Sequence, residues 1–184
     1  MRAFVVVLFC IGLLSSCSTT QNVAVNEAKI KQLKEWIDAK ELRVIVNTAS
    51  PISTQEIGQL GFLLPNGSTP NRILLTGGND YFQMSGENIK ADLPYFGTRQ
   101  LGGEYNYNRG GIKFEGKPKS YKVSYDENKK VYLLKYKINA NKESFNITVK
   151  VFPNHKAEMY INTSHRTAIN FNGFVRQEET VASN

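Results

Sequence analysis

The sequence has few of the residues that most enzymes and metal proteins use for chemistry. Its 184 residues include 2 Cys and 2 His. Two cysteines cannot build a disulfide framework or a four-cysteine zinc site. The spacings of a P-loop, an H-E-x-x-H zinc site and a G-x-S-x-G nucleophile elbow are absent. No apolar run reaches the roughly 18 residues that a membrane-spanning helix needs.

The composition is that of one folded domain. The 9 Tyr and 10 Phe exclude a disordered chain, and 14 Gly without a period exclude collagen. A net charge of +7 is the one unusual feature of the composition. A chain of this length fits a single domain of ordinary size.

The N-terminus has the pattern of a secretory signal. Met1-Arg2 is a short basic start, and residues 3–14 are uninterrupted apolar sequence. Residues Leu14, Ser15, Ser16 and Cys17 then resemble a bacterial lipoprotein box, which implies cleavage before Cys17 and lipid attachment to its sulfur. An ordinary cleaved signal or a short membrane anchor is the alternative interpretation.

Lipidation predicts where the mature chain lies. One acyl chain anchors a protein marginally, whereas two or three make the attachment effectively permanent. Residues 1–16 are then the signal peptide, and residues 17–26 form the lipidated cysteine and a flexible tether. Ser18 beside the cysteine resembles the outer-membrane sorting pattern of Gram-negative lipoproteins. We therefore expect an outer-membrane protein that faces the periplasm, with the membrane as its first partner.

The remaining chain predicts a mainly β domain over residues 27–176. Residues 27–41 have helical spacing, with Asn26 as the N-cap, and from Leu42 onward the apolar period changes to two. One of the short strands is expected over Arg72–Thr76. Short strands joined by short turns favour an antiparallel meander, curled into a barrel or folded as a two-sheet sandwich. Residues 177–184 read as a disordered tail.

Three local patterns together resemble a known family. They stand behind the glycine pair at 77–78, in the order Leu93-Pro94-Tyr95-Phe96-Gly97, then Gly110-Gly111-Ile112-Lys113-Phe114 with Gly116, then Val151-Phe152-Pro153-Asn154 with Ala157, Met159 and Ile161. In this order they resemble the DUF4251 family of Bacteroidetes lipoproteins, over about Val44 to Val175. His155 departs from the family turn, which usually has Gly there. The resemblance implies an envelope location and a β-rich domain, and it implies no catalytic residues.

The residues that could carry chemistry are scattered. His155 and His165 would each need a carboxylate or nucleophile brought from elsewhere in the fold. The sequence therefore predicts no catalytic residue, no metal site and no cofactor. The best contact surface is an aromatic platform for a glycan or a partner protein, formed by Tyr95, Tyr105 and Tyr107. The alternative is that Tyr95 and Phe96 plug one end of the sheet.

The positive charge is concentrated in one part of the chain. Residues 111–158 hold 11 Lys against 5 acidic residues, while the segments on either side are balanced. On the polar phase of the expected strands lie Lys113, Lys122, Lys135, Lys137 and Lys150. These lysines predict a basic sheet face for anionic lipid, glycan phosphates or an acidic partner protein. A face that only aids solubility is the alternative, and nucleic acid is not an expected partner.

Two functions follow from these observations. The first is a non-enzymatic, lipid-anchored envelope protein that binds or scaffolds. The second is a β-barrel carrier whose aromatic interior holds a small apolar or glycan-like ligand. A hydrolase would require His155 or His165 to lie in a cleft beside a nucleophile or an acid.

Overall fold

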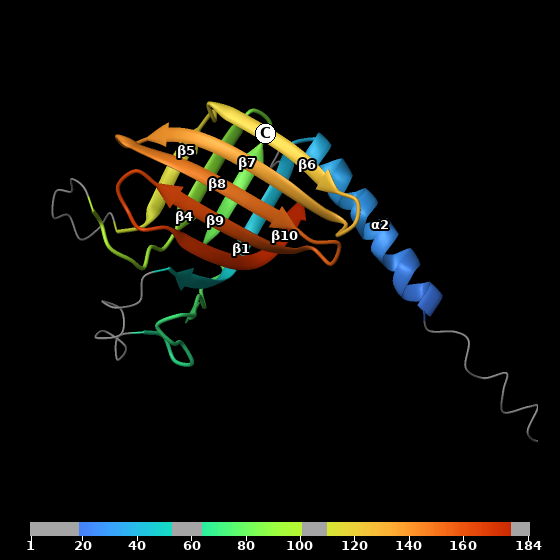
Figure 1. Cartoon of the computed structure of the whole chain (residues 1–184), viewed down its shortest axis with the longest axis horizontal. Coiled ribbons are helices and arrows are strands. Elements are labelled where there is room, and N and C mark those ends of the chain that lie inside the picture. The colour runs from blue at the N-terminus through green and yellow to red at the C-terminus, as the bar shows by residue number, and fades with distance from the viewer. Residues whose placement is uncertain (1–18, 53–63, 101–109, 178–184) are drawn as a thin grey trace, which may run out of the picture.

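In the part of the chain that the structure describes, a long helix is followed by a curled antiparallel sheet (Figure 1). The computed structural model describes residues 19–52, 64–100 and 110–177. The elements are α2 (Thr19–Asp38), β1 (Glu41–Pro51), β2 (Ile73–Leu74), β3 (Tyr81–Ser85), β4 (Asn88–Leu93), β5 (Ile112–Gly116), β6 (Ser120–Asp126), β7 (Val131–Ala140), β8 (Glu143–Val151), β9 (Lys156–Thr163) and β10 (Ile169–Gln177).

The sheet is a single half-barrel, which decides between the two expected architectures. Its strand order is β5-β4-β3-β1-β10-β9-β8-β7-β6, and β2 adds to β1. The sheet curls until its first part faces its second, so that the ring of Phe114 in β5 lies 5.1 Å from that of Phe145 in β8. Strands β5 and β6 are consecutive in the chain but lie at opposite ends of the strand order.

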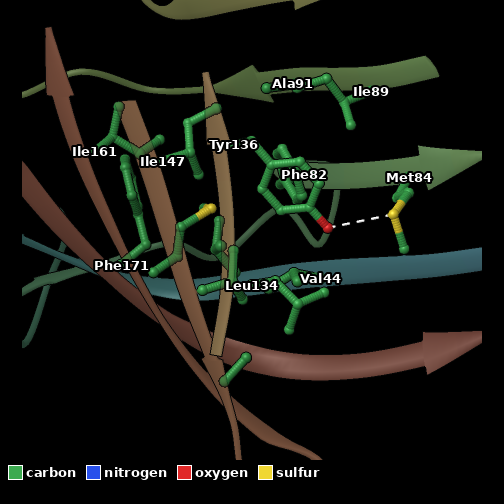
Figure 2. Packing of buried hydrophobic residues seen from close by; sticks show 14 of the residues in the cluster. Val44, Phe82, Met84, Ile89, Ala91, Leu134, Tyr136, Ile147, Ile161 and Phe171 are labelled. Atoms are coloured by element: carbon green, nitrogen blue, oxygen red, sulfur yellow. Dashed lines mark hydrogen bonds between the residues drawn. The ribbon is translucent and has the colours of Figure 1, made fainter. Parts of the chain in front are cut away.

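The core fills the inside of this curl. Along β7 and β8 buried and exposed residues alternate, as the period of two predicts. Figure 2 shows Phe82 and Tyr136 meeting across the interior, with ring centroids 5.2 Å apart. The Tyr136 hydroxyl donates a hydrogen bond to Met84 Sδ at 3.3 Å. These contacts fill the space between β3 and β7 with side chains.

Helix α2 packs on the core with its C-terminal part and differs from the prediction. Leu33, Trp36 and Ile37 are buried in the core, as their spacing indicates. However, the helix begins at Thr19 rather than at residue 27, so the expected tether over residues 17–26 is wrong from residue 19 onward, and Asn26 is not the N-cap. No Pro or Gly interrupts residues 19–38, so nothing in the sequence stops the helix at Asn26. Its end at Asp38, before the predicted 41, coincides with Lys40 at φ 57°.

Strand β1 organises the middle of the sheet. It pairs with β10 along its whole length, with β3 through Glu41–Ile45 and with β2 through Thr48 and Ala49. Because β3 already occupies half of this edge, β2 is two residues long and not the five expected over 72–76. A bulge between Val46 and Thr48 shifts the β1–β10 register beside Gly173.

Candidate functional site

Four of the five predicted basic residues share one outer face of the sheet. Lys122 in β6 lies directly opposite Lys135 in β7, while Lys137 follows on β7 and Lys150 lies on β8. All four side chains are exposed, and along β7 and β8 the residues on either side of these lysines point into the core. We call Lys122, Lys135, Lys137 and Lys150 the lysine face.

The lysine face is weakly neutralised. Among the described residues, only Lys150 has an ionic partner, with its Nζ 3.9 Å from the Glu158 carboxylate. The outward positions between the lysines are neutral and include Asn146 and Thr148. Adjacent strands lie roughly 4.8 Å apart, so like charges directly opposite one another repel. An anion that sits over this face would relieve that repulsion.

Lys113 does not belong to this face, which corrects the prediction. It lies on β5, at the other end of the strand order from β6, and its ammonium is 2.9 Å from the Asp92 carboxylate. Phe114 points from β5 toward Phe145 of β8, so the outer side of β5 faces away from the outer side of β8. Alternation within a strand identified the exposed side of Lys113, but it could not show that the sheet curls between the two strands.

Tyr95 is part of the structure's internal bonding. Its hydroxyl lies 3.0 Å from the Thr98 carbonyl, 2.9 Å from the Thr167 carbonyl and 2.8 Å from Thr167 Oγ1. Burial raises the pKa of this phenol. The hydroxyl therefore links the segment after β4 to the segment before β10, and the ring is half-buried. Tyr105 and Tyr107 lie outside the described residues, as do Leu14, Ser15, Ser16 and Cys17.

A buried ion pair beside Tyr95 was not predicted. Arg166 Nε donates to Glu143 Oε2 at 3.2 Å, with both side chains almost fully buried. Arg166 Nη1 also donates to the carbonyls of Gly110 at 3.2 Å and Gly111 at 2.8 Å. The guanidinium thereby fixes the chain at the start of β5, and its Cζ lies 5.2 Å from the centre of the Tyr95 ring. One sequence signal was available, since Glu143 falls on the same inward phase of β8 as Phe145 and Ile147.

We expect Glu143→Gln to destabilise the domain by about 3 kcal/mol, because it leaves the buried Arg166 cation without its counter-charge. The free energy of unfolding in urea measures this loss. The matched control is Asp38→Asn, which breaks the exposed Lys34–Asp38 pair on α2 and should change stability little. Equal stabilities of the two variants would contradict the structural role assigned to Arg166 and Glu143.

The two histidines lie apart from one another. His155 occupies the β8–β9 turn at φ 63°, and its ring lies 5.1 Å from that of Trp36. Burial lowers the pKa of His155. His165 Nδ1 forms a 2.7 Å hydrogen bond with the hydroxyl of the adjacent Ser164 in an exposed turn. The described contacts thus connect His155 to helix packing and His165 to its neighbour in the chain.

Two findings on the described residues bear on membrane and metal sites. In the described part of the chain, no helix is both long enough and apolar enough to cross a bilayer. Within the same residue ranges, no group of three His, Cys, Asp or Glu side chains is placed to hold a metal ion.

Comparison with known proteins identifies the family. The profile of DUF4251, a domain of unknown function, matches residues 24–175. The chain belongs to the DUF4251 family. A similar solved structure is that of a DUF4251 family protein from Bacteroides eggerthii DSM 20697, with a TM-score of 0.56 and 11% identity, covering 82% of this chain and 88% of that one. At that identity, the likeness shows the shared DUF4251 fold. No curated protein matches the chain.

The family match extends beyond the sheet. It begins at residue 24 and so includes most of α2 as well as all strands up to Val175. The helix therefore belongs to the DUF4251 domain.

Proposed function

We propose that this protein is a lipid-anchored envelope protein that binds anionic membrane surfaces without catalysis. The lysine face carries the proposal, since four exposed ammonium groups share one side of three neighbouring strands. Lysines close to an anionic bilayer each contribute about 1 kcal/mol to binding. The negative phosphate groups of lipid headgroups lie at the bilayer surface, where these exposed positive side chains can reach them.

The lipid anchor at Cys17 is the second part of the proposal. Helix α2 begins two residues after Cys17, and its N-terminal turns project beyond the sheet (Figure 1). The helical residues before the buried Leu33 span about 20 Å, so this part of an anchored α2 would act as a stiff spacer between the lipid and the domain. Ser18 supports an outer-membrane location that faces the periplasm.

The absence of catalysis is proposed from how the buried polar groups are used. The Tyr95 hydroxyl donates to the Thr167 carbonyl, and the Arg166 guanidinium donates to Glu143 and to the Gly111 carbonyl. They hold the ends of loops in place, which is a structural task. Binding through exposed charge needs none of these groups.

Reversing three lysines of the lysine face tests the proposal. We expect Lys135→Glu, Lys137→Glu and Lys150→Glu together to weaken binding to vesicles that contain phosphatidylglycerol by about 100-fold, from about 1 kcal/mol per lysine. A chain that starts at Ser18 removes the anchor, so that sedimentation with vesicles reports the face alone. Binding by the unaltered face should also fall as salt rises.

The matched control reverses three lysines that lie off the lysine face, namely Lys31, Lys113 and Lys142. This variant has the same net charge as the test variant, so it should bind nearly as well as the unaltered chain if position matters. Equal loss in both variants would show that only net charge acts. Binding to neutral phosphatidylcholine vesicles at the same strength would also contradict the proposal.

A further inference from the structure

A pocket of about 220 Å³ opens near the C-terminal end of α2. It is bounded by the β3–β4 turn on one side and by the connection from β5 to β6 on the other. It lies where β5 and β6 separate, because these consecutive strands go to opposite ends of the sheet. The pocket does not include any residue of the lysine face.

The rim of the pocket is positively charged. It carries Lys40, Lys117 and Lys119 against a single carboxylate, that of Glu87. Glu87 forms ion pairs with Lys40 and with Lys117, the second at 3.5 Å. Both lysines lower the pKa of Glu87, first through the hydrogen bond from Lys40, so this carboxylate stays ionised. Lys119 has no ionic partner among the described residues, and the rim keeps an excess of two positive charges.

The wall of the pocket is apolar and aromatic. Met84 and Ile89 line it together with the rings of Tyr121 and Tyr136, which stack with centroids 4.9 Å apart and planes inclined by 22°. The Tyr136 hydroxyl is already engaged, since it donates to Met84 Sδ.

The Tyr121 hydroxyl is the unusual group of this site. Its oxygen is buried and has no hydrogen-bond partner in the structure. The Tyr136 hydroxyl is near enough to affect the pKa of Tyr121, but no hydrogen bond of normal geometry joins the two. Burial raises the pKa of Tyr121, so the phenol keeps its proton and can donate it. A buried donor without an acceptor is costly, and a ligand oxygen would satisfy it.

We propose that this pocket binds a small molecule that carries a phosphate or carboxylate group on an apolar body. The anionic group lies between Lys117 and Lys119 and accepts a hydrogen bond from the Tyr121 hydroxyl. The apolar body of the ligand packs against Met84 and Ile89. A pocket of this volume equals the space of about seven waters, at about 30 Å³ each. It therefore fits a compact ligand or the terminal group of a larger one. The site is separate from the lysine face and goes beyond the proposed function.

Methionine methyl resonances offer a direct test with an internal control. Beyond Met1, the chain has two methionines, of which Met84 lines the pocket and Met159 is buried in β9 away from it. The lipidated chain in neutral detergent, labelled at the methionine methyl carbons, is titrated with phenyl phosphate. We expect a saturable shift of the Met84 resonance and none of Met159. Benzoate and inorganic phosphate, titrated in parallel, distinguish carboxylate from phosphate and show what the apolar body contributes.

Two variants assign the interaction to its residues. Tyr121→Phe should weaken phenyl phosphate binding about tenfold, the loss expected for one hydrogen bond to a charged group. It should leave the unfolding midpoint unchanged or raised, because it removes an unpartnered hydroxyl. Lys119→Gln should weaken binding by a similar factor. Tyr125→Phe, on the same strand but outside the pocket, is the matched control and should bind normally.

The contrary results are equally definite. Phenol that shifts Met84 at the same concentrations as phenyl phosphate would overturn the anionic specificity. An unmoved Met84 resonance with phenyl phosphate, benzoate and inorganic phosphate would overturn the site itself. Reversal of the lysine face should leave the Met84 titration unchanged, so failure of one proposal is distinguishable from failure of the other.

Discussion

Replacing Gly173 with alanine is expected to destabilise the domain by about 3 kcal/mol or more, enough to prevent folding of a marginally stable protein. Gly173 lies on β10 opposite Val46, beside the bulge of β1. A Cβ atom at this position would lie 2.0 Å from the Ile45 carbonyl oxygen and 2.8 Å from the Val46 Cα. These atoms belong to the backbone, so no side-chain rotation can relieve the contact.

Only a movement of the backbone could relieve this contact. Moving β10 away from β1 would weaken one of the two longest pairings in the sheet, which runs from Leu42 with Gln177 to Pro51 with Ile169. That pairing joins the first strand to the last in the middle of the sheet, so its loss would divide the sheet between β1 and β10. Gly173 is required here for close backbone approach and not for an unusual φ.

Urea unfolding compares this variant with a matched control. Gly77→Ala places its Cβ in open space, with no atom within 4 Å, and should leave stability nearly unchanged. If Gly173→Ala unfolded at the same urea concentration as Gly77→Ala, the close approach of β10 to β1 would be wrong.

Replacing Cys17 with alanine is expected to abolish membrane attachment of the mature protein. The proposed anchor depends on a sulfur that accepts diacylglycerol, and alanine cannot accept it. The variant should either remain unprocessed with residues 1–16 attached or be recovered outside the membrane fraction. Because two or three acyl chains hold a lipoprotein effectively permanently, the change should be close to complete.

Cell fractionation with a lipid label measures this outcome. Cys10→Ala is the matched control, because Cys10 belongs to the predicted signal and leaves with it. It should be processed and labelled as the unaltered chain is. Unchanged lipid labelling of Cys17→Ala would refute the anchor.

The alternation of apolar and polar residues predicted most strands, because successive side chains of a strand point alternately into the core and into solvent. The pattern of Tyr132, Leu134 and Tyr136 identifies the inner face of β7 without any knowledge of its partners. The same alternation places Phe145, Ile147 and Val149 on the inner face of β8. It failed for β2, whose length is limited by how much of β1 remains free beside β3.

Long-range arrangement could not be predicted from local pattern. The pairing of Leu42 with Gln177 and the separation of β5 from β6 depend on the whole strand order. For this reason Lys113 was grouped with four lysines that lie elsewhere. The pocket was missed for the same reason, since it brings Lys40 and Lys117 together only when the sheet curls.

The most direct test of the central claim, a lipid-anchored protein, is the mass of the N-terminal peptide of the mature protein isolated from membranes. The account predicts that this peptide begins at Cys17 and carries a diacylglycerol thioether on its sulfur. A membrane-bound protein whose Cys17 is unmodified, or whose mature chain begins at another residue, would contradict it.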